Sequence, residues 1–281
     1  MTARDYLSLL DTERETQFAA VTLVYKNDFA FIGFRGTDTS RTGWKEDFNM
    51  TFSAPVPAQE HAARYLETVA PHLPRRLFIG GHSKGGNLAE YAALKASPAV
   101  QDRLEKVFIL DGPGFKDGLF AAEDYAPVVG RMHKVIPEGA LVGILLDSLA
   151  PLRVAPSSAK GIAQHSVFTW EVDPEAHDFR YLDDLPDATK DTAATLRVWL
   201  DRYDDAEREQ VVEALFRAID VSGAEDALDF LAGGPHALGL LTNAALRVDG
   251  ADRALVFDAV RSFVEVAAAQ AAANAGQAVQ G

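Results

Sequence analysis

The pentapeptide Gly81–Gly85, which reads G-H-S-K-G, constrains this chain more than any other segment. A short apolar run, Leu77–Ile79, precedes it, and a helix-forming run that begins with small residues, Gly86–Leu94, follows it. A strand that turns sharply into a helix holds a serine hydroxyl above the sheet, and the helix N-terminus stabilises developing negative charge. The segment therefore predicts Ser83 as a nucleophile at a strand–turn–helix junction.

The segments on either side alternate between strand and helix patterns. They predict a hairpin over Phe18–Phe34, a helix over Ala58–Val69, and later strands over Val107–Leu110, Met132–Ile136 and Val167–Val172. Alternating strands and helices imply a mainly parallel sheet, and a G-x-S-x-G turn in that setting is the nucleophile elbow of the α/β-hydrolase fold. We therefore expect an α/β-hydrolase core over residues 1–185.

Beyond about Pro186 the strand signals stop. The remaining pattern is amphipathic and helical, over Leu196–Leu200, Val211–Ile219, Ala227–Leu231 and Leu255–Ala273. We expect residues 186–281 to form a C-terminal helical region packed on the core.

The composition excludes several classes of function. Lysine and arginine number 27 against 41 aspartates and glutamates, a net charge of −14, which disfavours nucleic acids and anionic membranes as partners. The chain has no cysteine, so disulfides, thiolate metal sites and a cysteine nucleophile are excluded. The sequence contains no run of membrane-spanning length and no recognisable signal peptide, which predicts a cytoplasmic protein without stable membrane insertion. It leaves the oligomeric state open.

A serine needs a histidine as its base, and that histidine follows the serine in α/β-hydrolases. Four histidines follow Ser83: His133, His165, His177 and His236. The first begins a predicted strand, the third lies in an acidic surface stretch, and the last falls in the helical region. His165 lies in a loop just before a predicted strand, next to the sheet, so it is the predicted base.

Three acids are candidates to orient that histidine. Glu138 lies just past a predicted strand between the serine and the histidine, which is where a strand-end catalytic acid belongs, and it ranks first. Asp111 ends the preceding strand and ranks second, because it also suits a turn before Gly112. Asp147 ranks third, since it follows an apolar run and suits a helix cap.

The tetrahedral intermediate of ester cleavage needs two hydrogen-bond donors for its oxyanion. The backbone N–H of Lys84, directly after the nucleophile, is the first. The loop Phe34–Asp38 after an early strand offers Thr37 as the second, although this loop is also compatible with a plain turn in which Arg35 pairs with an aspartate.

Three motifs together resemble the class 3 lipases. They are F-R-G-T at Phe34–Thr37, G-W-K-E-D at Gly43–Asp47, and G-H-S-K-G-G-N-L-A at Gly81–Ala89. The sequence is still more similar to an uncharacterised lipase-like α/β-hydrolase family known largely from Gram-positive bacteria. That family shares the lysine after the serine, a D-G-P-G-F turn, an I-P-E segment and a Q-H before T-W, and the resemblance covers about Glu15 to Leu255.

The resemblance implies Ser83 as nucleophile, His165 as base and Thr37 with Lys84 as oxyanion donors. The lipase acid would fall on Glu138. Two departures stand out: the segment that matches the lipase lid, Asp38–Pro55, is too polar to enter a lipid interface, and Lys84 replaces the usual leucine, which suggests a cation at the site's mouth.

We therefore expect a serine hydrolase that cleaves a carboxylic ester through an acyl-enzyme intermediate, without metal or organic cofactor. Its substrate would be a small-molecule ester, a soluble acyl ester or lysolipid-like molecule rather than an oil droplet. The alternative is a non-catalytic hydrolase-fold interaction module, because fold alone does not establish activity.

Overall fold

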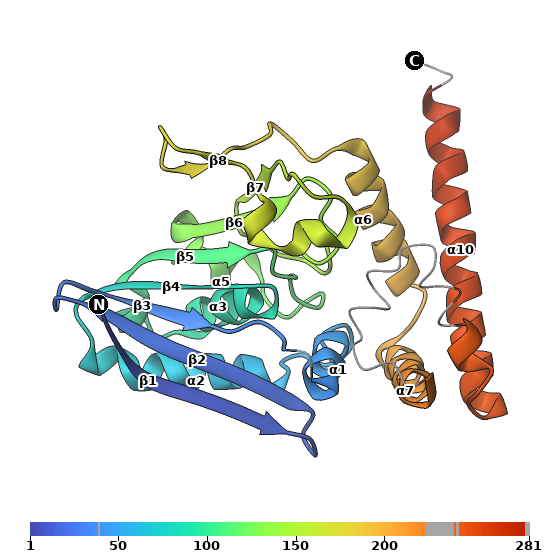
Figure 1. Cartoon of the computed structure of the whole chain (residues 1–281), viewed down its shortest axis with the longest axis horizontal. Helices are drawn as coiled ribbons and strands as arrows, with labels where there is room; N and C mark the ends of the chain where they lie inside the picture. The colour runs from blue at the N-terminus through green and yellow to red at the C-terminus, as the bar shows by residue number, and fades with distance from the viewer. Residues whose placement is uncertain (39, 223–238, 240–241, 279–281) are drawn as a thin grey trace. The chain divides into compact units, whose positions relative to one another are not determined.

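The structure is a computed structural model that describes residues 1–38, 40–222, 239 and 242–278. Its contacts divide the chain into two compact units, Met1–Leu185 and Pro186–Gly281 (Figure 1). That these units are separate domains, with the second packed on the first, stays a prediction.

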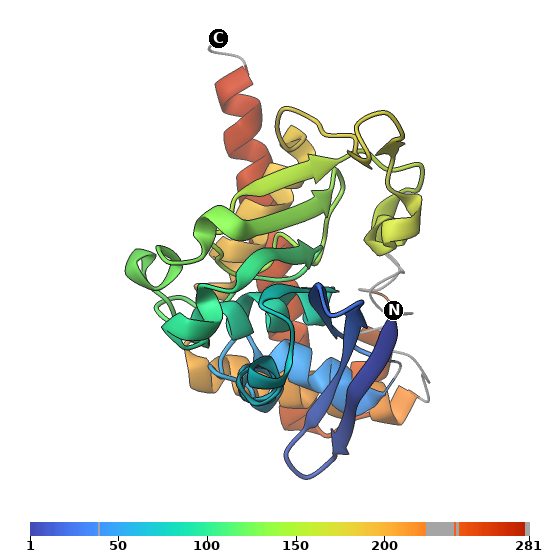
Figure 2. The ribbon, with the colours of Figure 1, turned by 90° about the vertical axis from the view of Figure 1, so that its left-hand side faces the viewer.

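The first unit contains a seven-stranded sheet in which spatial order follows chain order, so that the strands lie side by side from the N-terminal hairpin to β7 (Figure 2). The strands are β1 (Thr2–Asp11), β2 (Thr16–Tyr25), β3 (Phe29–Phe34), β4 (Arg76–His82), β5 (Leu104–Leu110), β6 (Met132–Pro137) and β7 (Leu152–Ala155). β2 is antiparallel to both of its neighbours, β1 and β3, and β3 to β7 are parallel. The carboxyl ends of the parallel strands therefore meet along one edge of the sheet.

Apolar helix faces cover one side of this sheet. The connections contain α1 (Arg41–Asn49), α2 (Pro57–Val69), η1 (Ala70–His72), α3 (Lys84–Lys95), α4 (Pro98–Gln101), α5 (Ala122–Tyr125) and η2 (Val129–Arg131). Leu66 of α2 and Leu88 of α3 share a buried cluster with Ile32, Ile79 and Ile109 of the strands. Crossovers between successive parallel neighbours have one hand, which brings successive helices to the same face of the sheet.

This arrangement confirms the predicted fold class. A mostly parallel sheet with flanking helices, carrying the serine turn between a central strand and the next helix, is the α/β-hydrolase architecture, and further helices follow it in the chain.

Two strands of the sheet were missed by the sequence patterns, and one predicted strand is wrong. β1 is largely exposed and carries a bulge between Arg4 and Leu7, which breaks the alternation that marks a strand. β7 has four residues between prolines, too short to give a signal. The predicted strand Val167–Val172 instead begins as the 3₁₀-helix η4 (Val167–Thr169), which follows η3 (Gly161–His165). Its last residue belongs to a two-residue strand, β8 (Val172–Asp173), which pairs only with β9 (Asp178–Phe179).

The second unit is helical in its described residues. It contains α6 (Asp187–Leu200), α7 (Asp205–Ser222) and α10 (Gly250–Ala278). Arg217 of α7 and Asp252 of α10 form a bidentate ion pair, with N–O distances of 2.5 and 2.7 Å. The predicted helical stretch Ala227–Leu231 lies outside the described residues. No helix in the described part of the chain is both long and apolar enough to cross a membrane.

Candidate active site

Ser83 occupies the turn between β4 and α3 in a strained backbone conformation. Its φ of 59° and ψ of −133° lie outside the regions that side chains readily adopt, at a cost on the order of 1–3 kcal/mol. The flanking glycines permit this turn: a Cβ on Gly85 would lie 2.2 Å from the carbonyl oxygen of Phe34, and one on Gly81 would lie 2.3 Å from the carbonyl carbon of Gly85. Close backbone packing therefore requires glycine at positions 81 and 85, and the residue in the strained conformation is Ser83.

His165 lies at the end of η3 and contacts an acid from the neighbouring strand. Its Nδ1 lies 2.6 Å from Oδ2 of Asp111, the residue that follows β5. Asp111 is fully buried, and its other oxygen accepts a 2.9 Å hydrogen bond from the backbone N–H of Gly143. With the Nδ1 proton donated to this carboxylate, Nε2 is left as the basic nitrogen of a neutral imidazole.

His82, the residue before the serine, holds His165 beside the turn. The Nε2 of His82 donates a 2.6 Å hydrogen bond to the backbone oxygen of His165, and the two rings lie 4.4 Å apart. Burial lowers the pKa of His82, and the charge that His165 acquires on protonation lowers it further. His82 is thus kept neutral as a packing partner for His165.

Glu138, the acid ranked first from the sequence, lies elsewhere. It follows β6, and its Oε1 accepts a 3.2 Å hydrogen bond from the backbone N–H of Ser157. The structure brings Asp111 rather than Glu138 to Nδ1 of His165. The reason is strand order: β5 pairs directly with β4, which carries the serine, whereas β6 is one strand further away.

The other candidates lie apart from this contact. Asp147 forms backbone hydrogen bonds with Phe115. His133 stacks against Phe108 on the sheet, at 5.7 Å between ring centroids, and His177 lies in an exposed turn. His236 lies outside the described residues.

The loop after β3 passes directly beside the serine. A Cβ on Gly36 would lie 2.7 Å from the backbone oxygen of His82 and 3.4 Å from Cβ of Ser83. Thr37 follows at once, and its hydroxyl donates to Oδ2 of Asp47. Lys84 is the first residue of α3, and the first N–H groups of a helix have no acceptor within it. The two predicted oxyanion donors therefore lie in segments that meet at Ser83.

The side chain of Lys84 is buried, so the expected cation at the mouth of the site is wrong. Only 1% of it is exposed, and its Nζ lies 2.7 Å from Oε2 of Glu46 and 3.6 Å from Oδ1 of Asp47, both on α1. Burial raises the pKa of Asp47 to about 6, although the Lys84 cation opposes this shift. The sequence patterns did not single out these two acids as residues of the site. The sequence feature that could have pointed to them is Lys84 in place of the usual leucine, since a buried lysine needs a carboxylate partner.

Residues 1–217 match the model of a protein family, which is more than half of the chain and is enough to assign the family. The chain belongs to the Mbeg1-like family.

Solved structures similar to this Mbeg1-like chain include two lipases. M37 lipase shares 13% identity over 50% of this chain and 54% of its own, with a TM-score of 0.36. A fungal lipase solved with an inhibitor shares 16% identity over 65% of this chain and 71% of its own, with a TM-score of 0.40. No curated protein matches the sequence. Family membership therefore rests on the family model.

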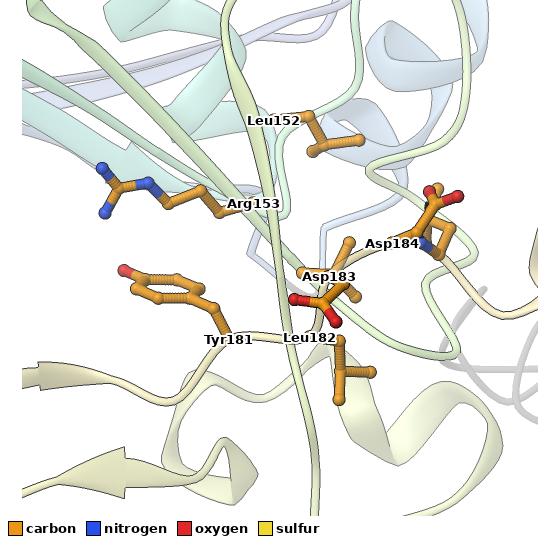
Figure 3. Close-up of a pocket in the computed structure, with 8 residues that line it drawn as sticks. Leu152, Arg153, Tyr181, Leu182, Asp183 and Asp184 are labelled. Atoms are coloured by element: carbon orange, nitrogen blue, oxygen red, sulfur yellow. Dashed lines mark hydrogen bonds between the residues drawn. The ribbon is translucent and has the colours of Figure 1, made fainter.

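The Mbeg1-like chain also has a groove along the edge strand β7, with a volume of about 430 Å³ (Figure 3). Its lining residues are Leu152, Arg153, Val154, Tyr181, Leu182, Asp183, Asp184 and Leu185. The Arg153 guanidinium lies 5.0 Å from the centroid of the Tyr181 ring. None of the serine-site residues lines this groove. Over the part of the chain that is described, no three histidine or acidic side chains are grouped so as to hold a metal ion.

Proposed function

We propose that this Mbeg1-like protein is a serine hydrolase that cleaves a carboxylic ester through an acyl-enzyme intermediate. One observation carries the proposal: a buried aspartate binds Nδ1 of a histidine whose ring packs against His82, the residue directly before a strained serine. Serine, acid and histidine occur in the chain order of α/β-hydrolases.

In the proposed mechanism, Ser83 Oγ attacks the ester carbonyl while Nε2 of His165 takes its proton. Asp111 holds the imidazole in the required tautomer and stabilises its positive charge. The same proton then passes to the departing alcohol. A water then attacks the acyl-enzyme and gives a proton to His165. When the bond between the acyl carbon and Ser83 Oγ breaks, His165 returns that proton to Oγ, which releases the carboxylic acid and restores the serine.

We assign the acid to Asp111 in place of Glu138. The assignment follows from the 2.6 Å contact and the full burial of Asp111, since a carboxylate there interacts with the imidazole through little intervening water. The backbone N–H groups of Thr37 and Lys84 are the proposed oxyanion donors, because their segments converge on Ser83.

The proposed substrate is a soluble or lysolipid-like acyl ester. A net charge of −14 and a polar Asp38–Pro55 segment favour dissolved molecules over lipid surfaces. The cytoplasmic location also stays a prediction.

Covalent labelling tests the proposal. A fluorophosphonate probe should modify the folded wild-type protein, and peptide mapping should find the adduct on Ser83. Ser83→Ala should abolish labelling, whereas the matched control Ser158→Ala, at an exposed serine, should label like wild type. An unlabelled but folded wild-type protein would favour the non-catalytic interaction module instead.

A further inference from the structure

Lys84 contributes to the structure through two parts that lie in different surroundings. Its backbone N–H is at the start of α3, directly after Ser83. Its side chain runs into the interior, where both the ammonium group and the Glu46 carboxylate are shielded from water, with exposures of 1% and 0%. Buried charges are retained only with partners, and removing one partner of a buried ion pair is strongly destabilising.

Glu46 connects this cation to three segments. One of its oxygens accepts from Lys84 Nζ at 2.7 Å and from the backbone N–H of Gln17 at 2.9 Å. Its other oxygen accepts from the backbone N–H of Ala58 at 2.8 Å. The ion pair therefore ties α3 to β2, to the start of α2, and to α1 itself.

Asp47, the next residue on α1, extends the connection to the predicted oxyanion loop. Its Oδ1 lies 3.6 Å from Lys84 Nζ, and its Oδ2 accepts from the hydroxyl of Thr37. Oδ1 has no hydrogen-bond partner, so the lysine is its nearest compensating charge. A continuous path runs from the side chain of Lys84 through Asp47 to Thr37.

We propose that the side chain of Lys84 is a positioning element of the oxyanion hole, which holds α1 and the Thr37 loop at the distance from Ser83 that two-donor binding requires. Lys84 thereby contributes one donor through its backbone and places the other through its side chain. The inference rests on the proposed hydrolase function and identifies what keeps its oxyanion site assembled.

Loss of this positioning affects turnover more than binding. Oxyanion donors stabilise the transition state when they lie about 2.7–3.1 Å from the developing charge, and losing one costs about 10²- to 10³-fold in kcat. A displaced Thr37 retains part of its effect. We therefore expect Lys84→Met, which keeps the backbone N–H and the side-chain length, to lower kcat about 10- to 100-fold with KM near the wild-type value.

The experiment separates positioning from charge balance. Lys84→Met alone leaves Glu46 buried without its cation, so its melting temperature should fall. The double variant Lys84→Met/Glu46→Gln removes that charge and should recover part of the lost stability, because the amide oxygen of glutamine can still accept from one of the two backbone N–H groups, of Gln17 and Ala58, that Glu46 binds. Hydrolysis of p-nitrophenyl butyrate and melting temperature are measured for wild type, both variants and the control Lys45→Met. In that control the same change is made at a buried lysine of α1 that pairs with Glu15.

The inference predicts that the double variant melts above Lys84→Met while its kcat stays low, and that Lys45→Met keeps wild-type kcat. Recovery of kcat together with stability would show that Lys84 only balances buried charge, which overturns the inference. The inference is also overturned if the fluorophosphonate probe labels Ser83 of the wild type and Lys84→Met has the same kcat as the wild type. That result would leave the hydrolase proposal intact. A wild type that neither labels nor turns over refutes both.

Discussion

Asp111→Asn is the substitution for which the site geometry makes the sharpest prediction. The aspartate uses its two oxygens differently: Oδ1 accepts from the N–H of Gly143 at 2.9 Å, and Oδ2 faces Nδ1 of His165 at 2.6 Å. An asparagine can keep the first bond through its amide oxygen. Its NH₂ group then faces Nδ1, which forces the imidazole proton onto Nε2, where the base is needed.

The expected loss is about 10⁴-fold in kcat, because the histidine populates the wrong tautomer and its positive charge is no longer stabilised. The free energy of unfolding should change by only about 1 kcal/mol, because asparagine is isosteric with aspartate. The only hydrogen bond expected to change is the one to Nδ1 of His165, in which the asparagine NH₂ becomes the donor. We would measure kcat and KM with p-nitrophenyl butyrate, and melting temperature by circular dichroism.

Glu138→Gln is the matched control. The amide oxygen of glutamine can still accept from the N–H of Ser157, so turnover and melting temperature should both stay near the wild-type values. The assignment of the acid would be refuted if Asp111→Asn retained turnover within tenfold of wild type. A folded Glu138→Gln protein with a loss above a hundredfold would return the role to Glu138.

Two further predictions concern α1. Glu46 anchors α1 to Lys84 and to the N–H groups of Gln17 and Ala58, so this helix should not open as a lid. The hydrolysis rate should therefore rise smoothly as the concentration of a short-chain ester passes its solubility limit. A sharp rise in rate at that limit would contradict this prediction. The pKa of Asp47 is raised from 3.8 to about 6 in the fold, so its contribution to stability is present below about pH 4 and is lost as pH rises through 6. Asp47→Asn should therefore gain up to about 3 kcal/mol of unfolding free energy relative to wild type between pH 4 and 7.5, measured by urea denaturation, and an unchanged difference would show that the carboxylate is not destabilised by burial.

The serine turn could be predicted because its determinants are local. A strained backbone at residue 83 needs glycines within a few positions, a strand before it and a helix after it, and all of these are readable in one segment of about twenty residues. The hairpin Phe18–Phe34 and the helix Ala58–Val69 were predictable for the same reason, since periodicities of two and 3.6 residues reflect one buried face. β7 and β1 were missed because a four-residue strand and a bulged edge strand show no such period.

The contacts of the site depended on the folded arrangement of the strands. Local patterns were enough to place Ser83 in a strand–turn–helix motif and to offer His165, Asp111 and Glu138 as partners, but Asp111 and His165 are 54 positions apart. Which acid reaches the histidine is set by β5 lying next to β4, a pairing that no local pattern encodes. The burial of Lys84 also depends on the tertiary structure. From the sequence alone a lysine is expected at the surface, but here α1 places the carboxylates of Glu46 and Asp47 next to its ammonium group, and only paired charges are stable away from water.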